Sequence, residues 1–294
     1  MVGIGKHAGK SKSRLAQPHP LCQVDCVPSP ILTTDIRGQF ILLGTGTSVG
    51  VPSLGCPCEV CTSNDPRDKR TRCAALVGLP GGNLLIDTPP DLRQQLLREK
   101  VGIVHSVLFT HEHADHIFGL DDLRLFPFYL GGPIPLYCEE PVEHRIRRSF
   151  DYAFRDDEPT HHGAVPQLAF RRIGLAPFDV LGARVTPVRL LHGPKFEVLG
   201  FRIGNVAYCT DVKAIPGESM ALLTGLDVLV LDALRHRPHV THLSLDESIE
   251  IARQLTPRRT IFTHICHDLS HERTNAQLPH GMELGYDGMR LPLT

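Results

Sequence analysis

Short apolar runs alternate along the chain with polar turns rich in glycine and proline. Apolar runs of this kind, bounded by turn residues, are typical of buried β-strands. The first run lies at 39–43, and the runs at 74–79 and 83–87 flank Pro80-Gly81-Gly82 as a predicted hairpin. Further strands are expected at 104–109, 184–191, 205–210, 226–231 and 260–263.

Segments with helical spacing separate several of these strands. Leu92, Leu96 and Leu97 give one apolar face to a helix that starts near Pro89. Other helices are expected at 117–125, 216–223 and 244–255. Strands that alternate with helices in this way predict an α/β fold with mixed sheets.

Residues 1–37 lack this periodicity and are rich in Lys, Ser, Pro and Gly. We therefore expect a disordered tail, followed by one domain over residues 38–294. The composition, 41% hydrophobic and 21% charged, is sufficient for a sizeable core. No apolar run approaches the length that a membrane span or a secretory signal needs, so we expect neither.

The charge and the cysteines limit the expected partners. Thirty-one basic residues balance 32 acidic ones, so no overall field attracts nucleic acid or an anionic membrane. Nine cysteines, an odd number, do not form an even disulfide framework. We expect a cytoplasmic protein with a small-molecule substrate and, as the commonest oligomer, a homodimer.

One stretch concentrates ligand-type side chains, Thr110-His111-Glu112-His113-Ala114-Asp115-His116, directly after an apolar run. Neutral imidazoles and carboxylates bind zinc, iron or manganese. His111 and His113 are two residues apart, which suits a strand end or a tight loop better than a helix face. With Asp115 and His116 following, this loop is able to serve two metals.

The second half of the chain repeats the pattern of strands that end in ligand-type residues. Polar residues often end strands by chance, but a series of such endings predicts a sheet edge that collects metal ligands. The endings are His192, Asp211, Asp232 and His264, with His267 three residues after the last.

A cysteine cluster, Cys56, Cys58 and Cys61, has the close spacing of a structural zinc site. Such a site needs a fourth ligand from elsewhere in the chain, and three buried or redox-active thiols are the alternative interpretation. The preceding turn Gly44-Thr45-Gly46-Thr47-Ser48 is a weak phosphate motif, and we expect it instead to let the backbone turn tightly.

The segment 126–166 is the least regular. It is rich in proline, and we consider two interpretations, a substrate-facing lid and a surface excursion around one helix. Its histidines, His144, His161 and His162, have no supporting ligand context.

These residues together resemble the metallo-β-lactamase superfamily of metal-dependent hydrolases. The histidine loop comes first, followed in order by His192, Asp211 and His264. Within the superfamily, the chain is most similar to the phosphoribosyl cyclic phosphate phosphodiesterases of the carbon–phosphorus lyase pathway. The similarity runs from about Phe40 onward and includes 55–61, 263–267, Leu278-Pro279 and Tyr286-Asp287-Gly288-Met289.

The resemblance implies an αββα sandwich, in which two mixed β-sheets carry helices on both outer faces. It implies two catalytic divalent metals, Mn²⁺ or Zn²⁺, with Asp211 bridging them. The first metal would bind His111, His113, His192 and Asp211, and the second Asp115, His116, Asp211 and His264. It also implies a structural Zn²⁺ on Cys56, Cys58, Cys61 and His267.

The resemblance further implies a general acid at His242, for which His236 and His239 are the local alternatives. Asp115 and Asp211 would orient a metal-bridging hydroxide. Asp87 would fix a histidine tautomer, or alternatively cap the helix that starts near Pro89. Lys195 is a candidate substrate contact, with a solvated surface lysine as the alternative. The implied activity is hydrolysis of a small, cyclic phosphodiester. The alternatives are a ribonuclease Z-like nuclease that processes tRNA 3′ ends and a non-catalytic, zinc-stabilised binding protein.

Overall fold

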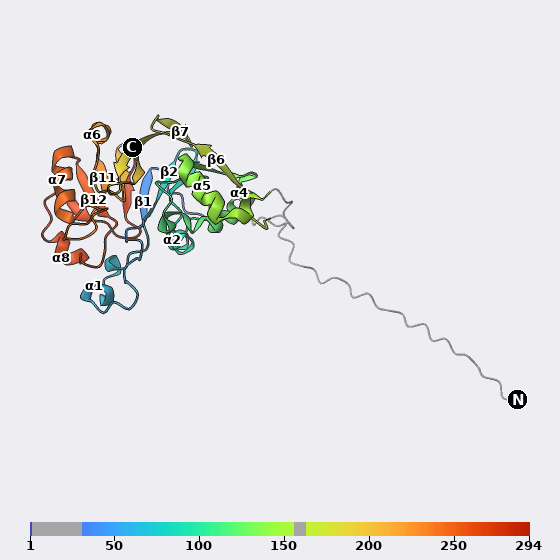
Figure 1. Cartoon of the computed structure of the whole chain (residues 1–294), viewed down its shortest axis with the longest axis horizontal. Helices are drawn as coiled ribbons and strands as arrows, with labels where there is room; N and C mark the ends of the chain where they lie inside the picture. Colours follow the sequence, from blue (N-terminus) through green and yellow to red (C-terminus); the bar gives the residue numbers. More distant parts are fainter. Residues whose placement is uncertain (2–30, 156–162) are drawn as a thin grey trace.

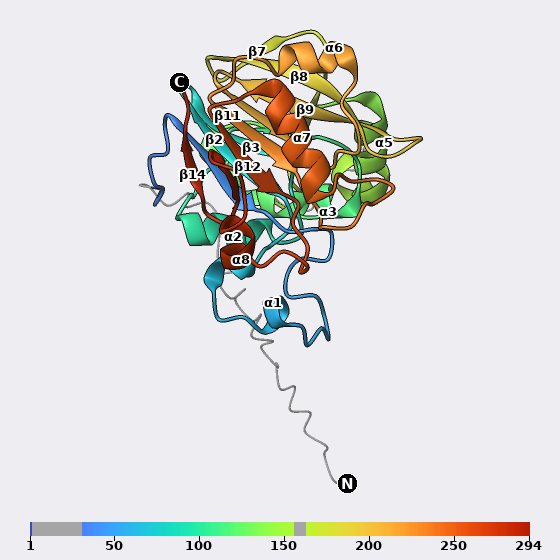
Figure 2. The same ribbon diagram turned by 90° about the vertical axis from the view of Figure 1, so that its left-hand side faces the viewer.

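The computed structural model describes Met1 and residues 31–155 and 163–294 of the chain. Fourteen strands in these ranges form two seven-stranded sheets that pack face to face (Figures 1 and 2). The first sheet, ordered β14-β1-β2-β3-β4-β5-β6, contains β1 (Gln39–Gly44), β2 (Ala74–Leu79), β3 (Gly82–Ile86), β4 (Ser106–Leu108), β5 (Ile134–Cys138), β6 (Leu168–Arg172) and β14 (Arg290–Pro292).

The second sheet has the order β13-β12-β11-β10-β9-β8-β7. Its strands are β7 (Phe178–Val180), β8 (Ala183–Leu191), β9 (Glu197–Ile203), β10 (Val206–Cys209), β11 (Val228–Asp232), β12 (Arg259–Thr263) and β13 (Met282–Leu284). Both sheets are mixed. β3 to β6 pair in parallel in the first, as β10 to β13 do in the second.

Helices cover the outer faces of both sheets (Figure 2). The described helices are α1 (Glu59–Thr62), which lies in a loop that protrudes from the sandwich, α2 (Leu92–Glu99), α3 (Ala114–Ile117), α4 (Phe126–Leu130), α5 (Glu140–Ser149), α6 (Gly217–Leu222), α7 (Leu245–Leu255) and α8 (His271–Asn275), with 3₁₀ turns at Pro66–Asp68, Leu120–Leu125 and Asp151–Phe154. Leu92 of α2 and Ile146 of α5 pack on the first sheet, whereas Leu255 of α7 packs on the second. The αββα sandwich is confirmed.

The core lies in three layers, one between the sheets and one beneath the helices on each side. Between the sheets, Phe40 and Leu84 of the first pack with Phe201 and Val230 of the second, all fully buried. Each such side chain contributes roughly 1.5–3 kcal/mol by leaving water. The parallel strand β11 is buried along its whole length, which explains its continuous run of Val and Leu.

Part of the expected N-terminal tail belongs to the packed domain. Ile36 is 1% exposed and joins the core under α2, and the Thr34 amide donates to the Lys100 carbonyl at 2.9 Å. The packed chain therefore begins before residue 38. Residues 2–30 of the expected tail lie outside the described residues.

The segment 126–166 is neither a lid nor a surface excursion over most of its described length. It supplies β5, an interior strand between β4 and β6, and α5, which covers the first sheet. The expected helix at 117–125 is instead the short α3 followed by a 3₁₀ turn, because the chain breaks at Phe118–Gly119. No helix in the described part of the chain is long and apolar enough to cross a membrane.

Candidate metal centre

Strand ends from both sheets bring the ligand-type side chains to one edge of the sandwich. In the first sheet, β3 and β4 run parallel and are followed by Asp87 and His111. In the second sheet, β10, β11 and β12 run parallel, and Asp211, Asp232 and His264 lie at or just beyond their ends. Because the carboxyl ends of parallel strands meet at one edge, side chains distant in sequence converge there.

The backbone is strained at three of these positions. Asp87, Asp211 and His264 have φ angles of 65°, 58° and 57°, in the left-handed region. Non-glycine residues in this region cost about 1–3 kcal/mol each and persist only where the surrounding structure enforces them. Such strain clusters at functional sites, and here it turns three side chains out of the strand direction.

The first ligand group contains His111, His113 and His192, whose ligand atoms all lie within 4.8 Å of one another. His111 Nε2 and His113 Nδ1 are 2.9 Å apart. His111 Nδ1 lies 2.9 Å from the Thr110 hydroxyl, and His192 Nδ1 lies 2.9 Å from the Thr241 carbonyl. Donation to these oxygens leaves both Nε2 atoms free to bind a metal.

The second group contains Asp115, His116 and His264, facing Asp211. His116 Nε2 lies 3.4 Å from Asp115 Oδ2 and 3.3 Å from Asp211 Oδ2. His264 Nε2 lies 3.4 Å from the other oxygen, Asp211 Oδ1. Each residue that the resemblance assigned to the dinuclear site therefore lies at this edge of the sandwich.

Asp211 lies between the two groups. Its Oδ1 faces His264 and, at 3.8 Å, His192, while its Oδ2 faces His116. Burial by itself would raise the pKa of Asp211, but His264 and His116 outweigh it and hold that pKa well below its ordinary value. A carboxylate that stays ionised between two imidazole groups is placed to bridge two cations.

Unpaired buried nitrogens show that this pocket fits divalent cations. His116 Nε2 and both ring nitrogens of His264 are buried and have no hydrogen-bond partner among the described residues. Burial would lower the pKa of His116, yet the carboxylates of Asp211 and Asp87 raise it well above its ordinary value. An environment that attracts a proton so strongly equally favours a metal cation in its place.

Asp87 fixes the orientation of the histidine loop. Its carboxylate accepts hydrogen bonds from the Thr110 amide and hydroxyl, both at 2.8 Å, and lies 2.8 Å from His116 Nδ1. The His116 proton therefore sits on Nδ1, and Nε2 faces Asp211. This arrangement supports the expectation that Asp87 selects a histidine tautomer.

Replacing Asp87 by asparagine should weaken divalent-metal binding about 10- to 100-fold, the usual effect of losing such a partner. The asparagine amide can donate to His116 Nδ1 and so favours the wrong tautomer. Titration of metal-free protein with Mn²⁺ measures the change, and circular dichroism checks that the variant folds. Unchanged affinity would show that Asp87 does not orient His116.

His242 lies beside the two ligand groups, with a buried carboxylate behind it. Its ring stacks on His264 with centroids 4.4 Å apart and meets His192 edge-on at 4.7 Å. Its Nδ1 lies 2.7 Å from Asp232 Oδ2, which also accepts the Val212 amide at 2.8 Å. Burial raises the pKa of Asp232 well above its ordinary value and lowers the pKa of His242, so the pair competes for one proton.

Four residues form a separate group, three cysteines in the loop around α1 and His267 in the loop after β12. His267 Nδ1 lies 3.2, 3.4 and 3.5 Å from the sulfurs of Cys56, Cys58 and Cys61. A Cys₃His set at these spacings fits a closed, tetrahedral structural zinc site. The Cys61 amide lowers the pKa of Cys58 to about 7, which favours the thiolate that zinc binds.

The loop 264–269 joins the two sites and is anchored independently of either. The Ile265 amide donates to the Thr45 carbonyl at 2.8 Å, and the Cys266 amide donates to the Leu234 carbonyl at 3.0 Å. Arg70, fully buried, donates to the carbonyls of Cys266 and Leu269 at 2.9 and 2.7 Å. A Cβ at Gly46 would lie 2.6 Å from the Arg70 carbonyl, so the glycine turn serves close packing here, as expected.

Several sequence candidates lie apart from these groups. His144 is exposed beside Glu140, and His236 is exposed on the loop after β11. Lys195, in contrast, lines a cavity of about 390 Å³ together with His111 and Glu112, and so lies beside the first ligand group. His161 and His162 lie outside the described residues. Sequence reasoning assigned no role to Asp232 or Thr241, although Asp232 follows the strand-end pattern.

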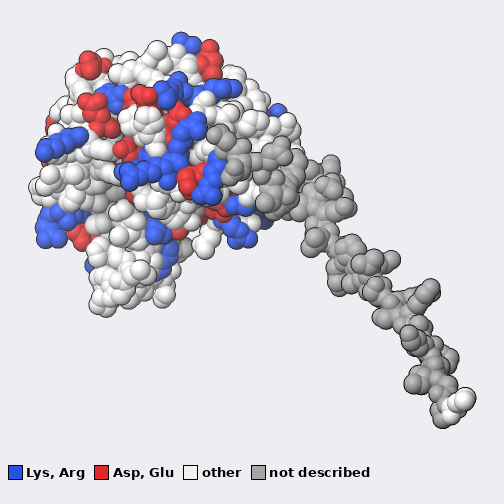
Figure 3. Space-filling model, turned by 45° about the vertical axis from the view of Figure 1, so that its right-hand side comes forward, with Lys and Arg blue, Asp and Glu red and all other residues white. Residues whose placement is uncertain are grey.

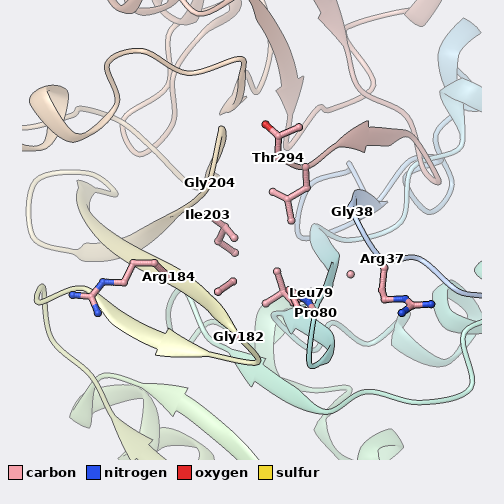
Figure 4. Close-up of a pocket in the computed structure, with 12 residues that line it drawn as sticks. Arg37, Gly38, Leu79, Pro80, Gly182, Arg184, Ile203, Gly204 and Thr294 are labelled. Carbon is pink, nitrogen blue, oxygen red and sulfur yellow. The ribbon is translucent and has the colours of Figure 1, made fainter.

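A cavity of about 580 Å³ lies at the opposite end of the strands (Figure 4). The turns β2–β3, β7–β8 and β9–β10 enclose it, and Arg37 and Arg184 flank it. None of its twelve described lining residues is His, Cys, Asp or Glu. The candidate metal ligands described above therefore lie away from this cavity.

Comparisons with known proteins agree with this geometry. Residues 82–265, well over half of the chain, match the family described as Beta-lactamase superfamily domain. An octanoyltransferase of Porphyromonas gingivalis is 37% identical over 255 residues, which is 85% of this chain and 51% of that protein. The chain thus spans about half the length of this relative. Coenzyme PQQ synthesis protein B of Methylorubrum populi is 32% identical over 114 residues, covering 34% of this chain and 36% of that protein.

Solved structures extend the match over most of the chain. A diphosphatase from the PhnP family is 45% identical, with a TM-score of 0.80, and the match covers 86% of this chain and 96% of that one. Zn²⁺-bound PqqB from Methylobacterium extorquens shares the fold at 22% identity and a TM-score of 0.71, over 87% of this chain and 100% of that one. The chain therefore belongs to the metallo-β-lactamase superfamily, within which it is a PhnP-like, metal-dependent hydrolase.

Proposed function

We propose that the chain is a dinuclear phosphodiesterase that hydrolyses a small phosphodiester, with His242 as the general acid. The observation that carries the proposal is the His242–Asp232 pair next to two groups of ligand side chains that share Asp211. One cation would bind His111, His113, His192 and Asp211, and the other Asp115, His116, Asp211 and His264. Two divalent cations held in this way activate water and neutralise charge on phosphoryl oxygens.

The protein's own groups then supply the proton transfers. Asp115, on the surface side of the second group and 3.4 Å from His116 Nε2, is placed to orient the attacking water. Asp232 holds His242 by Nδ1, so His242 Nε2 is the atom that delivers a proton to the departing oxygen. An alkoxide leaves poorly without such a proton, which explains why a buried acid is useful here.

The charge distribution favours a small substrate over a polyanion. The net charge is −1, and Figure 3 shows acidic side chains interspersed among the basic ones on the face drawn there. Arg147 and Arg172 both pair with Glu143, and Arg189 pairs with Glu139. Basic groups neutralised in this way offer little attraction to a long nucleic acid.

A diphosphate bond is the second candidate target, because the 45% identical PhnP-family structure is described as a diphosphatase. The two reactions share the displacement at phosphorus and differ in the leaving group. A departing phosphate is far less basic than an alkoxide, so it needs the His242 proton less. The effect of removing His242 should therefore separate the two candidates.

Kinetics with Mn²⁺ on ribose 1,2-cyclic phosphate, bis(p-nitrophenyl) phosphate and a nucleoside diphosphate test the proposal. Wild-type protein should turn over the cyclic phosphodiester with the highest kcat/KM. His242→Ala should lower kcat on that substrate about 10²- to 10⁴-fold, the range for a positioned general acid. The loss should be smaller for bis(p-nitrophenyl) phosphate, whose nitrophenolate leaves without a proton.

His236→Ala is the matched control, since His236 lies exposed on the same loop, and it should retain full activity. Preference for the diphosphate, with little effect of His242→Ala, would favour the second candidate. Cleavage of a tRNA precursor at comparable efficiency would favour the nuclease alternative. No turnover of any phosphoester above a His113→Ala control would contradict the proposal.

A further inference from the structure

A cavity of about 280 Å³ opens beside His242, on the side of the loop that follows β11. Thr47 and Ser48 line it from one side, and His242 and His264 from another. The loop residues Arg235 and His239 complete its wall. Because His242 lines this cavity, we expect the departing part of a substrate that His242 protonates to lie at or near its mouth.

The loop that carries His239 is closed by hydrogen bonds at its base. The Leu234 amide donates to the Leu243 carbonyl at 3.0 Å, and the Leu245 amide donates to the Arg235 carbonyl at 2.9 Å. The Arg235 guanidinium donates across the loop to the carbonyls of Arg237 and Pro238, at 3.2 and 3.1 Å. His239 is thus held on a fixed loop, with its ring 5.3 Å from that of His242.

Thr241 determines which nitrogen of His239 carries the proton. The Thr241 amide donates to His239 Nδ1 at 3.3 Å, and the Thr241 hydroxyl lies 3.1 Å from the same atom. A backbone N–H can only donate, so Nδ1 must present its lone pair. In the neutral ring the proton then sits on Nε2, which has no hydrogen-bond partner among the described residues.

The surroundings also keep this imidazole neutral. Burial, followed by the nearby His242, Arg235, Lys213 and His192, lowers the pKa of His239. A second proton, added at Nδ1 of His239, would face the Thr241 N–H, and the two donors would repel each other. His239 therefore differs from His242, whose Nδ1 faces a carboxylate.

We propose that His239 is a substrate-binding residue, whose Nε2–H donates a hydrogen bond to an oxygen of the leaving group next to the one that His242 protonates. The inference rests on the proposed phosphodiesterase function and assigns part of its specificity. A neutral donor selects leaving groups that carry a hydroxyl, ether or phosphate oxygen at this point. It contributes to substrate binding and takes no part in proton transfer.

The test compares His239→Leu, His239→Gln and the exposed control His236→Ala on two substrates, ribose 1,2-cyclic phosphate and diphenyl phosphate. The leaving group of the first bears further oxygens, whereas that of the second has none. His239→Leu should raise KM about tenfold on the first substrate only, the loss expected for one neutral hydrogen bond, and leave kcat within about twofold. Glutamine, whose amide can replace the Nε2–H, should restore much of the binding.

An unchanged KM in His239→Leu, or an equal rise on both substrates, would contradict the inference. A fall in kcat together with a changed pH profile would instead identify His239 as an acid or base. If the wild type turns over neither substrate, the proposed function fails and the substrate contact with it, whereas ¹⁵N NMR of the histidine rings separately tests the tautomer on which the inference depends. At pH 7 it should show His239 protonated on Nε2 alone, and a proton on Nδ1 would overturn the assignment.

Discussion

Replacing Asp211 by asparagine should lower phosphodiester turnover about 10³-fold or more, because the variant cannot bridge two cations with an anionic carboxylate. The loss corresponds to the several kcal/mol that metal-centred charge stabilisation supplies. Both oxygens of Asp211 face histidines, Oδ1 toward His264 and Oδ2 toward His116. An amide offers one neutral oxygen to this pair, so at least one cation should also bind more weakly. Steady-state kinetics at saturating Mn²⁺ measure the effect.

Asparagine is the informative substitution at this position. Asp211 has a φ of 58°, and asparagine tolerates the left-handed region better than other non-glycine residues. The variant should therefore fold, which thermal denaturation can check. Asp227→Asn is the matched control, since Asp227 lies just before β11 at the opposite end of the same sheet and pairs there with Arg258. Activity within a few-fold of wild type in Asp211→Asn would contradict the bridging role.

Replacing Cys58 by serine should remove one zinc ion per chain and lower the free energy of unfolding by more than about 3 kcal/mol, as loss of a metal site does. The four ligands join the loop around α1 to the loop after β12. Turnover at saturating Mn²⁺ should fall less than about tenfold, because the contacts of Ile265 and Arg70 keep His264 in place. Urea denaturation and zinc analysis measure the two effects.

Cys266→Ser is the matched control for this prediction. Cys266 lies next to the zinc ligand His267, in the loop after β12, but is not one of the four ligands. Its sulfur accepts a hydrogen bond from the Asp268 amide at 3.3 Å. The control should keep its zinc and its stability. If Cys58→Ser retained zinc, or lost turnover as severely as Asp211→Asn, the separation between a structural and a catalytic site would be wrong.

The strands that carry the metal centre could be predicted because they are buried on both faces. β11 appears in the sequence as an unbroken apolar run that leads into Asp232, and β12, with Ile261 and Phe262 at its centre, leads directly into His264 at the sheet edge. The order of the ligands along the chain, together with the resemblance, then implied which residues gather. The geometry brings these side chains together in two groups around Asp211.

Six of the fourteen described strands, β5, β6, β7, β9, β13 and β14, were not predicted from the sequence. In β5 and β9 the reason is that residues that usually break strands lie inside them. Pro135 lies in β5, where the pairing with β4 begins only at Leu136, so its missing N–H costs little. Gly200 interrupts β9, where a Cβ would lie 2.8 Å from the Leu190 side chain and 2.9 Å from the Tyr208 carbonyl. In both cases tertiary pairing overrides the local preference.

The partners of the site histidines depend on contacts that leave no local pattern. Asp232 and His242 are ten residues apart, and only the closed loop after β11 places them together. The Thr241 carbonyl, which orients His192, is a backbone group and carries no sequence signal at all. The spacing of the cysteines likewise did not identify their fourth ligand, because His267 is 206 residues from Cys61 in the sequence.

Metal titration coupled to turnover tests the dinuclear phosphodiesterase most directly. Protein treated with a chelator should retain one zinc per chain and hydrolyse no bis(p-nitrophenyl) phosphate. On addition of Mn²⁺, turnover should rise until about two further equivalents are bound and then stay constant. Full turnover with one equivalent or none, or a protein that binds only the retained zinc, would contradict the account.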